Sequence, residues 1–215
     1  FSKYMNMLVD AGYTVVRMDQ NMNETVSSGK KKLVKREVSR VYSPGTQLEA
    51  DSDRLETTGP TSYLTTIYIE GFENSSMYHI GISMFDVATG ESQVYECRDA
   101  IQTHAKNGRG HEIGALADAY RILFAYPPKE LILYRFNVHE TASSILSKLG
   151  IQTHSNEVLT HCYPELDKKS KWLDQNHLDH YLGEMYTGCC GLNPIDYLGF
   201  GIRQHAPIAF SLGLE

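Results

Sequence analysis

The 215-residue sequence has few cysteines, no long apolar run and no phosphate-binding loop. Cys189 and Cys190 are adjacent, and neither they nor Cys97 and Cys162 give the spacing of about two to four residues typical of a zinc half-site. We therefore expect free, buried thiols in a reducing, intracellular compartment. No stretch of about 18 apolar residues predicts a membrane span, and the sequence has no basic region followed by an apolar region that would predict a secretory signal. Gly108-Arg109-Gly110 lacks the lysine and the spacing of a P-loop.

The composition is that of a globular protein, with 41% apolar and 21% charged residues. Its length suits one large domain, or one domain and part of another. Because the sequence opens on Phe1 and closes in an apparent helix, we expect it to belong to something longer. Residues 1–46 hold eight Lys and Arg against four Asp and Glu, a formal charge of +4, and the whole chain carries −6, which leaves −10 for the remainder. Only the first part suits a phosphate backbone.

The first part of the chain predicts a helix and two strands. Residues 2–11 have a helical pattern that Gly12 ends, and residues 13–18 are rich in strand formers. The polar residues 21–29 predict a loop. Residues 35–43 alternate as a strand that a Pro-Gly turn ends, with one face carrying Arg36, Val38, Arg40 and Tyr42.

The second part predicts an α/β domain with a mixed sheet, after a polar linker at residues 47–62. The expected strands are residues 63–70, 78–87, 92–97, 130–134 and 151–154, of which the first three form an antiparallel meander. The expected helices are residues 111–126, 140–149, most of 164–186, and a last one from 195 that is kinked near Gly199 and Gly201. The order βββαβαβ is that of ribonuclease H-like folds.

A basic cluster is the leading candidate site. Its side chains would contact DNA phosphates and make binding depend on salt. The alternative is an ordinary solvated surface, the usual fate of a charge run. The candidate DNA-binding residues are Lys30, Lys31, Lys32, Lys35, Arg36 and Arg40.

A metal-dependent nuclease is the alternative from another class. Ribonuclease H-like enzymes need converging carboxylates, and the candidates are Glu70, Asp86 and Glu96. Asp86 precedes a turn, where a capping role is the ordinary explanation. The histidines do not complete a metal site, because position 115 is alanine after His111-Glu112 and because no suitable ligands accompany the others, which are His154, His161, His177 and His180. We predict no catalytic and no metal-binding residue, and a protein-interaction module without DNA contact is a third hypothesis.

Three stretches, in the right order, resemble the MutS family of DNA mismatch repair proteins. The first is Ala11-Gly12-Tyr13-Thr14-Val15 with Gln20 after it, and the second, which is the most specific, is residues 35–46 with its ending Ser43-Pro44-Gly45-Thr46. The third runs from Leu64-Thr65-Thr66-Ile67-Tyr68 to Phe85-Asp86-Val87-Ala88-Thr89-Gly90-Glu91. Tyr197-Leu198-Gly199-Phe200-Gly201 adds a weaker match. The lysine-rich segment after Gln20 departs from the family's usual short stretch.

The resemblance implies a division of the chain. Residues 1–46 would be the later part of a mismatch-binding domain, 47–60 a linker, 61–192 a ribonuclease H-like connector domain, and 193–215 the start of a lever region. The family's Phe-x-Glu wedge would precede Phe1. The linker is compatible with bacterial, organellar and viral relatives alike.

The resemblance also implies a function for the parent protein. It would bind mismatched double-stranded DNA and couple that binding to an ATPase that uses ATP and Mg²⁺ in a domain this sequence does not contain. It would act as a homodimer or heterodimer, and its connector could contact a MutL-like partner.

Overall fold

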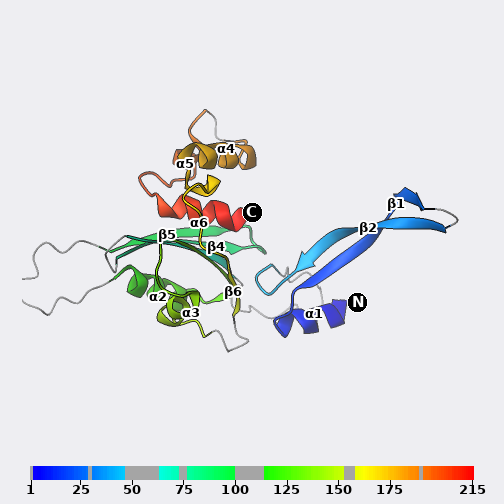
Figure 1. Cartoon of the computed structure of the whole chain (residues 1–215), viewed down its shortest axis with the longest axis horizontal. Helices are drawn as coiled ribbons and strands as arrows, with labels where there is room; N and C mark the ends of the chain where they lie inside the picture. The colour runs from blue at the N-terminus through cyan, green and yellow to red at the C-terminus, as the bar shows by residue number, and fades with distance from the viewer. Residues whose placement is uncertain are drawn as a thin grey trace, which may run out of the picture.

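The computed structural model describes residues 2–28, 31–46, 63–72, 77–99, 114–152, 158–188 and 191–215. Within them lie a two-stranded sheet, β1-β2, and a five-stranded sheet in the order β5-β4-β3-β6-β7. Figure 1 shows the two-stranded hairpin projecting away from the larger sheet, which has helices on both faces. The predicted linker at residues 47–60 lies outside the described residues.

The N-terminal unit is a short helix followed by a long hairpin. Helix α1 spans Ser2–Asp10, and Gly12, whose φ of 86° suits glycine, follows its end as predicted. Strand β1, Val15–Ser28, pairs antiparallel with β2, Lys31–Tyr42. The prediction of a loop at residues 21–29 was therefore wrong for 21–28. Pairing with the adjacent strand β2 outweighs local polarity there, because strand propensity depends strongly on context.

The hairpin contains an irregularity that changes which side chains share a face. Arg17 pairs with Arg40, but the next residue, Met18, pairs with Val38, so Ser39 is an extra residue on β2. A β-bulge of this kind reverses the alternation beyond it. The prediction that Arg36, Val38, Arg40 and Tyr42 share one face was therefore wrong.

The five-stranded sheet confirms the predicted mixed α/β layout. Strands β3 (Tyr63–Gly71), β4 (Tyr78–Asp86) and β5 (Ser92–Arg98) form the antiparallel meander. Strand β6 (Pro128–Phe136) runs parallel to β3, and β7 (Leu159–Cys162) runs parallel to β6. Of the strand predicted at residues 151–154, Ile151 and Gln152 are not in a strand, and residues 153 and 154 lie outside the described residues.

Two layers of helices cover the sheet. Helices α2 (Ala115–Ala125) and α3 (Ala142–Lys148) lie on one face, and α6 (His205–Leu214) lies on the other, with α4 (Gln175–Met185) and α5 (Pro194–Tyr197) beyond it (Figure 1). A short 3₁₀ helix spans Lys171–Leu173. Residues 164–186, predicted as mostly helix, are helical over 171–173 and 175–185 and are not helical over 164–170. No helix in the described ranges is long and apolar enough to cross a membrane.

Alternating side chains of the strands build two separate cores. Toward α2 and α3 the sheet presents fully buried aliphatic residues, which include Ile67, Ile82 and Leu133. Toward α6 it presents Tyr68, which packs in a second cluster with Phe200 and Phe210. Because both faces are covered, the central strands are apolar along most of their length.

Candidate nucleic-acid interface

The predicted cationic side chains that the structure describes are exposed on β2. Lys35, Arg36 and Arg40 all lie on the surface of the hairpin. Lys31 and Lys32 belong to the same strand, opposite Ser28 and Ser27, although their side chains are not described. Lys30 lies outside the described residues.

The bulge at Ser39 distributes these cations over both faces of the hairpin. Lys35 and Arg40 share a face with Arg17, because paired residues in a sheet project to the same side. Arg36, opposite Gln20, projects to the other face. Each face of the ribbon therefore presents at least one arginine to its surroundings.

The face with Arg40 carries charges of both signs. The Arg17 Nε lies 3.1 Å from the Asp19 carboxylate, and the Lys35 Nζ lies 3.0 Å from that of Glu37. A hydrogen bond from Ser39 lowers the pKa of Asp19 most, and the hydrogen bond from the Arg17 guanidinium lowers it further. These acids leave the face only weakly positive.

The face with Arg36 is largely apolar. Its neighbours across and along the strands are exposed aliphatic residues, namely Val16, Met18, Val38 and Val41. By the strand pairing, no carboxylate among the described residues of this face lies beside Arg36. Arg36 is therefore the cation of this face that is best suited to meet an anionic group.

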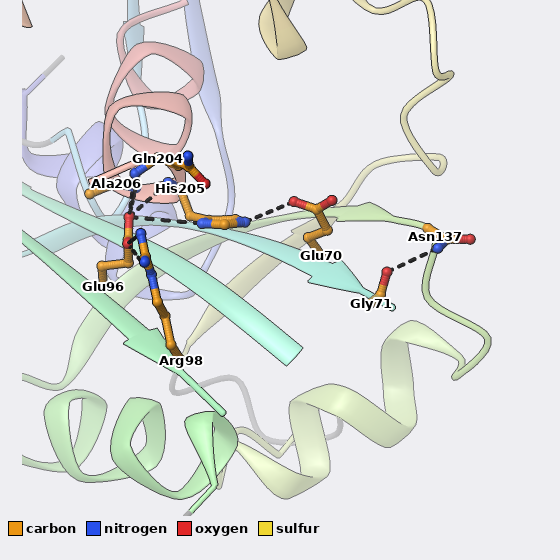
Figure 2. A network of polar contacts seen from close by, with 8 residues as sticks. All are labelled: Glu70, Gly71, Glu96, Arg98, Asn137, Gln204, His205 and Ala206. Carbon is orange, nitrogen blue, oxygen red and sulfur yellow. Dashed lines mark hydrogen bonds and ion pairs between the residues drawn. The ribbon is translucent and has the colours of Figure 1, made fainter. Parts of the chain in front are cut away.

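The three carboxylates of the nuclease hypothesis have structural partners. Glu70 Oε2 lies 2.8 Å from His205 Nε2, and Asp86 accepts hydrogen bonds from the backbone N–H of Ala88 (2.9 Å) and Thr89. Glu96 lies at the start of α6 (Figure 2). Across the described residues, no three His, Cys, Asp or Glu side chains form a group able to hold a metal ion. The geometry that the nuclease hypothesis requires is not found in that part of the chain.

Glu96 instead fixes the end of a helix. Its Oε2 accepts hydrogen bonds from the backbone N–H groups of Gln204 (2.9 Å), His205 (2.7 Å) and Ala206 (3.0 Å). Burial alone raises the pKa of Glu96, but the N–H groups of Ala206 and His205 and the Arg98 guanidinium outweigh it, and the pKa lies below its usual value. The first N–H groups of a helix need such an acceptor, so Glu96 ties β5 to α6.

Of the candidate histidines that the structure describes, His177 and His180 have local partners, whereas His161 meets a neighbouring strand. His161 Nε2 lies 2.8 Å from Glu130 Oε1, and His180 lies 3.5 Å from Glu184. His177 packs edge-on against Trp172, with ring centroids 5.2 Å apart. His111 and His154 lie outside the described residues.

Two of the four cysteines fall within the described ranges, and both are free. Cys97 is buried, as predicted, and burial raises the pKa of its thiol to about 11. Cys162 is exposed, so the expectation of buried thiols was wrong there, because β7 is an edge strand. Cys189 and Cys190 lie outside the described residues.

Sequence comparisons find known relatives for the segment that contains this hairpin. A sequence model of MutS domain I matches residues 1–51, which include both hairpin strands. A protein of Acanthamoeba polyphaga mimivirus, named as a homolog of the DNA mismatch repair protein mutS, is 30% identical over 236 residues and aligns with 100% of this chain. The chain belongs to the MutS family.

Bacterial MutS proteins align with about half of the chain. The DNA mismatch repair protein MutS of Thermotoga petrophila is 37% identical over 102 residues, 47% of this chain and 11% of the relative. That of Parasynechococcus marenigrum is 30% identical over the same shares. Even the mimivirus protein is covered over only 19% of its length. The chain thus spans less than a fifth of the MutS-family relatives it matches.

Two sets of polar contacts had no signal that sequence reasoning could use. Glu96 was considered as a metal ligand, but its partners lie about 110 positions later in the chain. Glu130 contacts Ser43 across 87 positions. A lone glutamate in a strand has no spacing pattern, so only the fold reveals what it meets.

Proposed function

We propose that this chain helps a MutS-like mismatch repair protein to hold mismatched double-stranded DNA, and that it joins the DNA-binding part to the rest of the molecule. The observation that carries the proposal is the exposed basic hairpin, which lies within the segment that matches MutS domain I. The candidate contacts remain Lys30, Lys31, Lys32, Lys35, Arg36 and Arg40.

The shape of the hairpin supports contact with duplex DNA. A two-stranded ribbon is narrow enough to enter a DNA groove, and backbone phosphates flank a groove on both sides. Because Arg36 and Arg40 project to opposite faces, a ribbon lying along a groove would present one arginine toward each phosphate strand. A hairpin lying flat against the DNA would contact phosphates through only one of its two faces.

The five-stranded unit is proposed as the connector domain, with a ribonuclease H-like fold. Its strand order, β5-β4-β3-β6-β7 with three antiparallel and then two parallel strands, supports that assignment. The connector would pass movement between the DNA-facing unit and an ATPase elsewhere in the whole protein. ATP and Mg²⁺ would bind there, since this sequence has no P-loop. Contact with a MutL-like partner and assembly as a dimer belong to the same proposal.

Separate replacement of the two arginines tests the DNA contact. In the whole protein, Arg36→Ala and Arg40→Ala should each weaken binding to mismatched duplex and flatten the slope of log K against log salt by about 0.9. The matched control is Arg121→Ala, which removes an exposed arginine of α2.

The pattern of the two slopes distinguishes the arrangements. Equal changes support a ribbon held between two phosphate strands, and a change for one arginine alone supports contact through one face. If neither slope differs from that of the Arg121→Ala control, the hairpin does not contact DNA through these residues, and the interaction-module hypothesis gains.

A further inference from the structure

A buried carboxylate of the sheet accepts hydrogen bonds from the turn that follows the hairpin. Glu130, at the start of β6, is only 6% exposed. Its Oε2 accepts hydrogen bonds from the Ser43 hydroxyl and from the Gly45 N–H, the latter at 3.1 Å. Its other oxygen, Oε1, lies 2.8 Å from His161 Nε2 on β7. One carboxylate thus joins the residues that follow β2 to two strands of the larger sheet.

The closing turn, residues 43–46, is ordered by its own hydrogen bonds. The Ser43 N–H donates to Thr46 Oγ1 at 3.1 Å, and the Thr46 N–H donates to the Ser43 carbonyl at the same distance. The two hydroxyls lie 2.8 Å apart. The turn therefore contacts Glu130 as an ordered unit. Because the turn directly follows β2, the orientation of the turn on the sheet sets the orientation of β2.

Close packing accompanies these hydrogen bonds. A Cβ atom on Gly45 would lie 2.7 Å from the Glu130 Cβ and 3.3 Å from the Leu64 Cα. Leu64 pairs with Glu130 just after an irregularity that leaves Lys129 without a partner on β3 and directs it outward. The turn therefore lies against the backbone of β3 as well as the side chain of β6, and only glycine fits there.

We propose that Glu130 is a positioning residue that fixes the orientation of the hairpin relative to the five-stranded sheet. A buried carboxylate that loses its donors is left without compensation, so partial opening of the contact is unfavourable. We therefore expect the hydrogen bonds between the turn and Glu130 to form or break as a set. His161, partly exposed beside Glu130, completes the set of donors.

This inference rests on the proposed function only in calling the hairpin DNA-facing; the contact itself does not depend on DNA. In a protein that binds DNA through the hairpin, a fixed orientation would carry a change at the DNA into β3 and β6. Loss of Glu130 would leave the phosphate contacts intact and would uncouple them from the sheet.

The test is the distribution of distances between the hairpin and the sheet in the whole protein without DNA. Spin labels on non-canonical residues at positions 38 and 124, both exposed, avoid the native cysteines. Double electron–electron resonance then compares the unsubstituted protein with Ser43→Ala, Glu130→Gln and Gly45→Ala. The matched controls are Glu91→Gln, an exposed glutamate, and Gly188→Ala, whose Cβ would meet only the Tyr197 hydroxyl at 3.8 Å.

We expect a single narrow distribution for the unsubstituted protein and for both controls. Glu130→Gln and Gly45→Ala should broaden it at least twofold, and Ser43→Ala, which removes one donor, should broaden it less. Ser43→Ala keeps the test decisive if either of the other variants fails to fold. Distributions as narrow as those of the controls in all variants that fold would overturn the proposal.

Measurement of DNA binding separates this inference from the proposed function. Glu130→Gln should leave the salt slope of DNA binding unchanged, because it removes no cation. A broadened distribution together with unchanged slopes for the Arg36 and Arg40 variants would retain the role of Glu130 and refute the DNA contact. An unchanged distribution together with flatter slopes for the Arg36 and Arg40 variants would retain the DNA contact and refute the role of Glu130.

Discussion

The hairpin and the five-stranded sheet place their apolar side chains in opposite environments. In the sheet, Ile67, Ile82 and Leu133 are completely buried between strands and helices. In the hairpin, Met18 and Val38 are more than half exposed, although they face one another across the two strands. The sheet is stabilised by cores of its own, whereas the described part of the hairpin is joined to the sheet through the closing turn at Glu130.

The two buried glutamates make the same comparison for polar groups. Glu96 and Glu130 each accept hydrogen bonds from backbone N–H groups in a distant part of the chain, and each also accepts one from a side chain, Arg98 and Ser43 respectively. Glu96 joins β5 to a helix of the same unit, so it contributes to the stability of that unit. Glu130 joins two units, so it contributes to their relative orientation. Two similar carboxylates can therefore have different roles, because the donors of one lie in the same structural unit and the donors of the other lie in a different unit.

The largest expected difference comes from equivalent truncations in the two regions. Leu133→Ala should lower the free energy of unfolding of the chain by about 2–5 kcal/mol, because it leaves a cavity in a packed core. Val38→Ala, at an exposed position, should change it by no more than about 0.5 kcal/mol. Urea unfolding followed by the fluorescence of Trp172 measures both variants. Similar losses for the two would refute the contrast in burial.

A smaller effect, with a distinct pH dependence, is expected for Glu96→Gln. The amide keeps one acceptor but loses the charge, so the cost at neutral pH should lie toward the lower end of about 1–3 kcal/mol. Because the pKa of Glu96 is lowered on folding, its charge stabilises the fold above the ordinary value of 4.5, and this contribution is lost as the pH falls through the folded pKa.

The matched variant for that prediction is Glu91→Gln in the turn before β5, where the side chain is exposed. Urea unfolding between pH 7 and pH 3 should show a flatter acid limb for Glu96→Gln than for the unsubstituted chain. Glu91→Gln should reproduce the unsubstituted curve. Equal slopes for all three would mean that the Glu96 carboxylate does not contribute as described.

The sequence predicted the sheet far better than the hairpin, for a physical reason. Apolar runs such as residues 63–70 carry a local signal of burial, and the bounds of all three meander strands were predicted to within one residue. The polar residues 21–28 carry no such signal, yet they belong to β1, which pairs with the strand that follows it. The bulge at Ser39 has no sequence mark either, so the division of Arg36 and Arg40 between two faces could not be foreseen.

The candidate site was predictable in its charge and not in its contacts. The cations of β2 could be recognised as a cluster, and the turn Ser43-Pro44-Gly45-Thr46 as the end of a strand. That this turn meets Glu130 depends on how two units pack, which a single sequence does not encode in any local pattern. Long-range polar contacts are for this reason the part of the site that required the structure.

Photo-crosslinking to DNA tests the central claim most directly, namely that the hairpin rather than the sheet unit contacts DNA. A photoreactive residue is placed in the whole protein at position 37 or 38 of the hairpin, or at position 124 on α2, where Phe124 is 77% exposed. We predict crosslinks to a mismatched duplex from positions 37 and 38, and none from position 124. Crosslinks from position 124 with none from the hairpin would contradict the account.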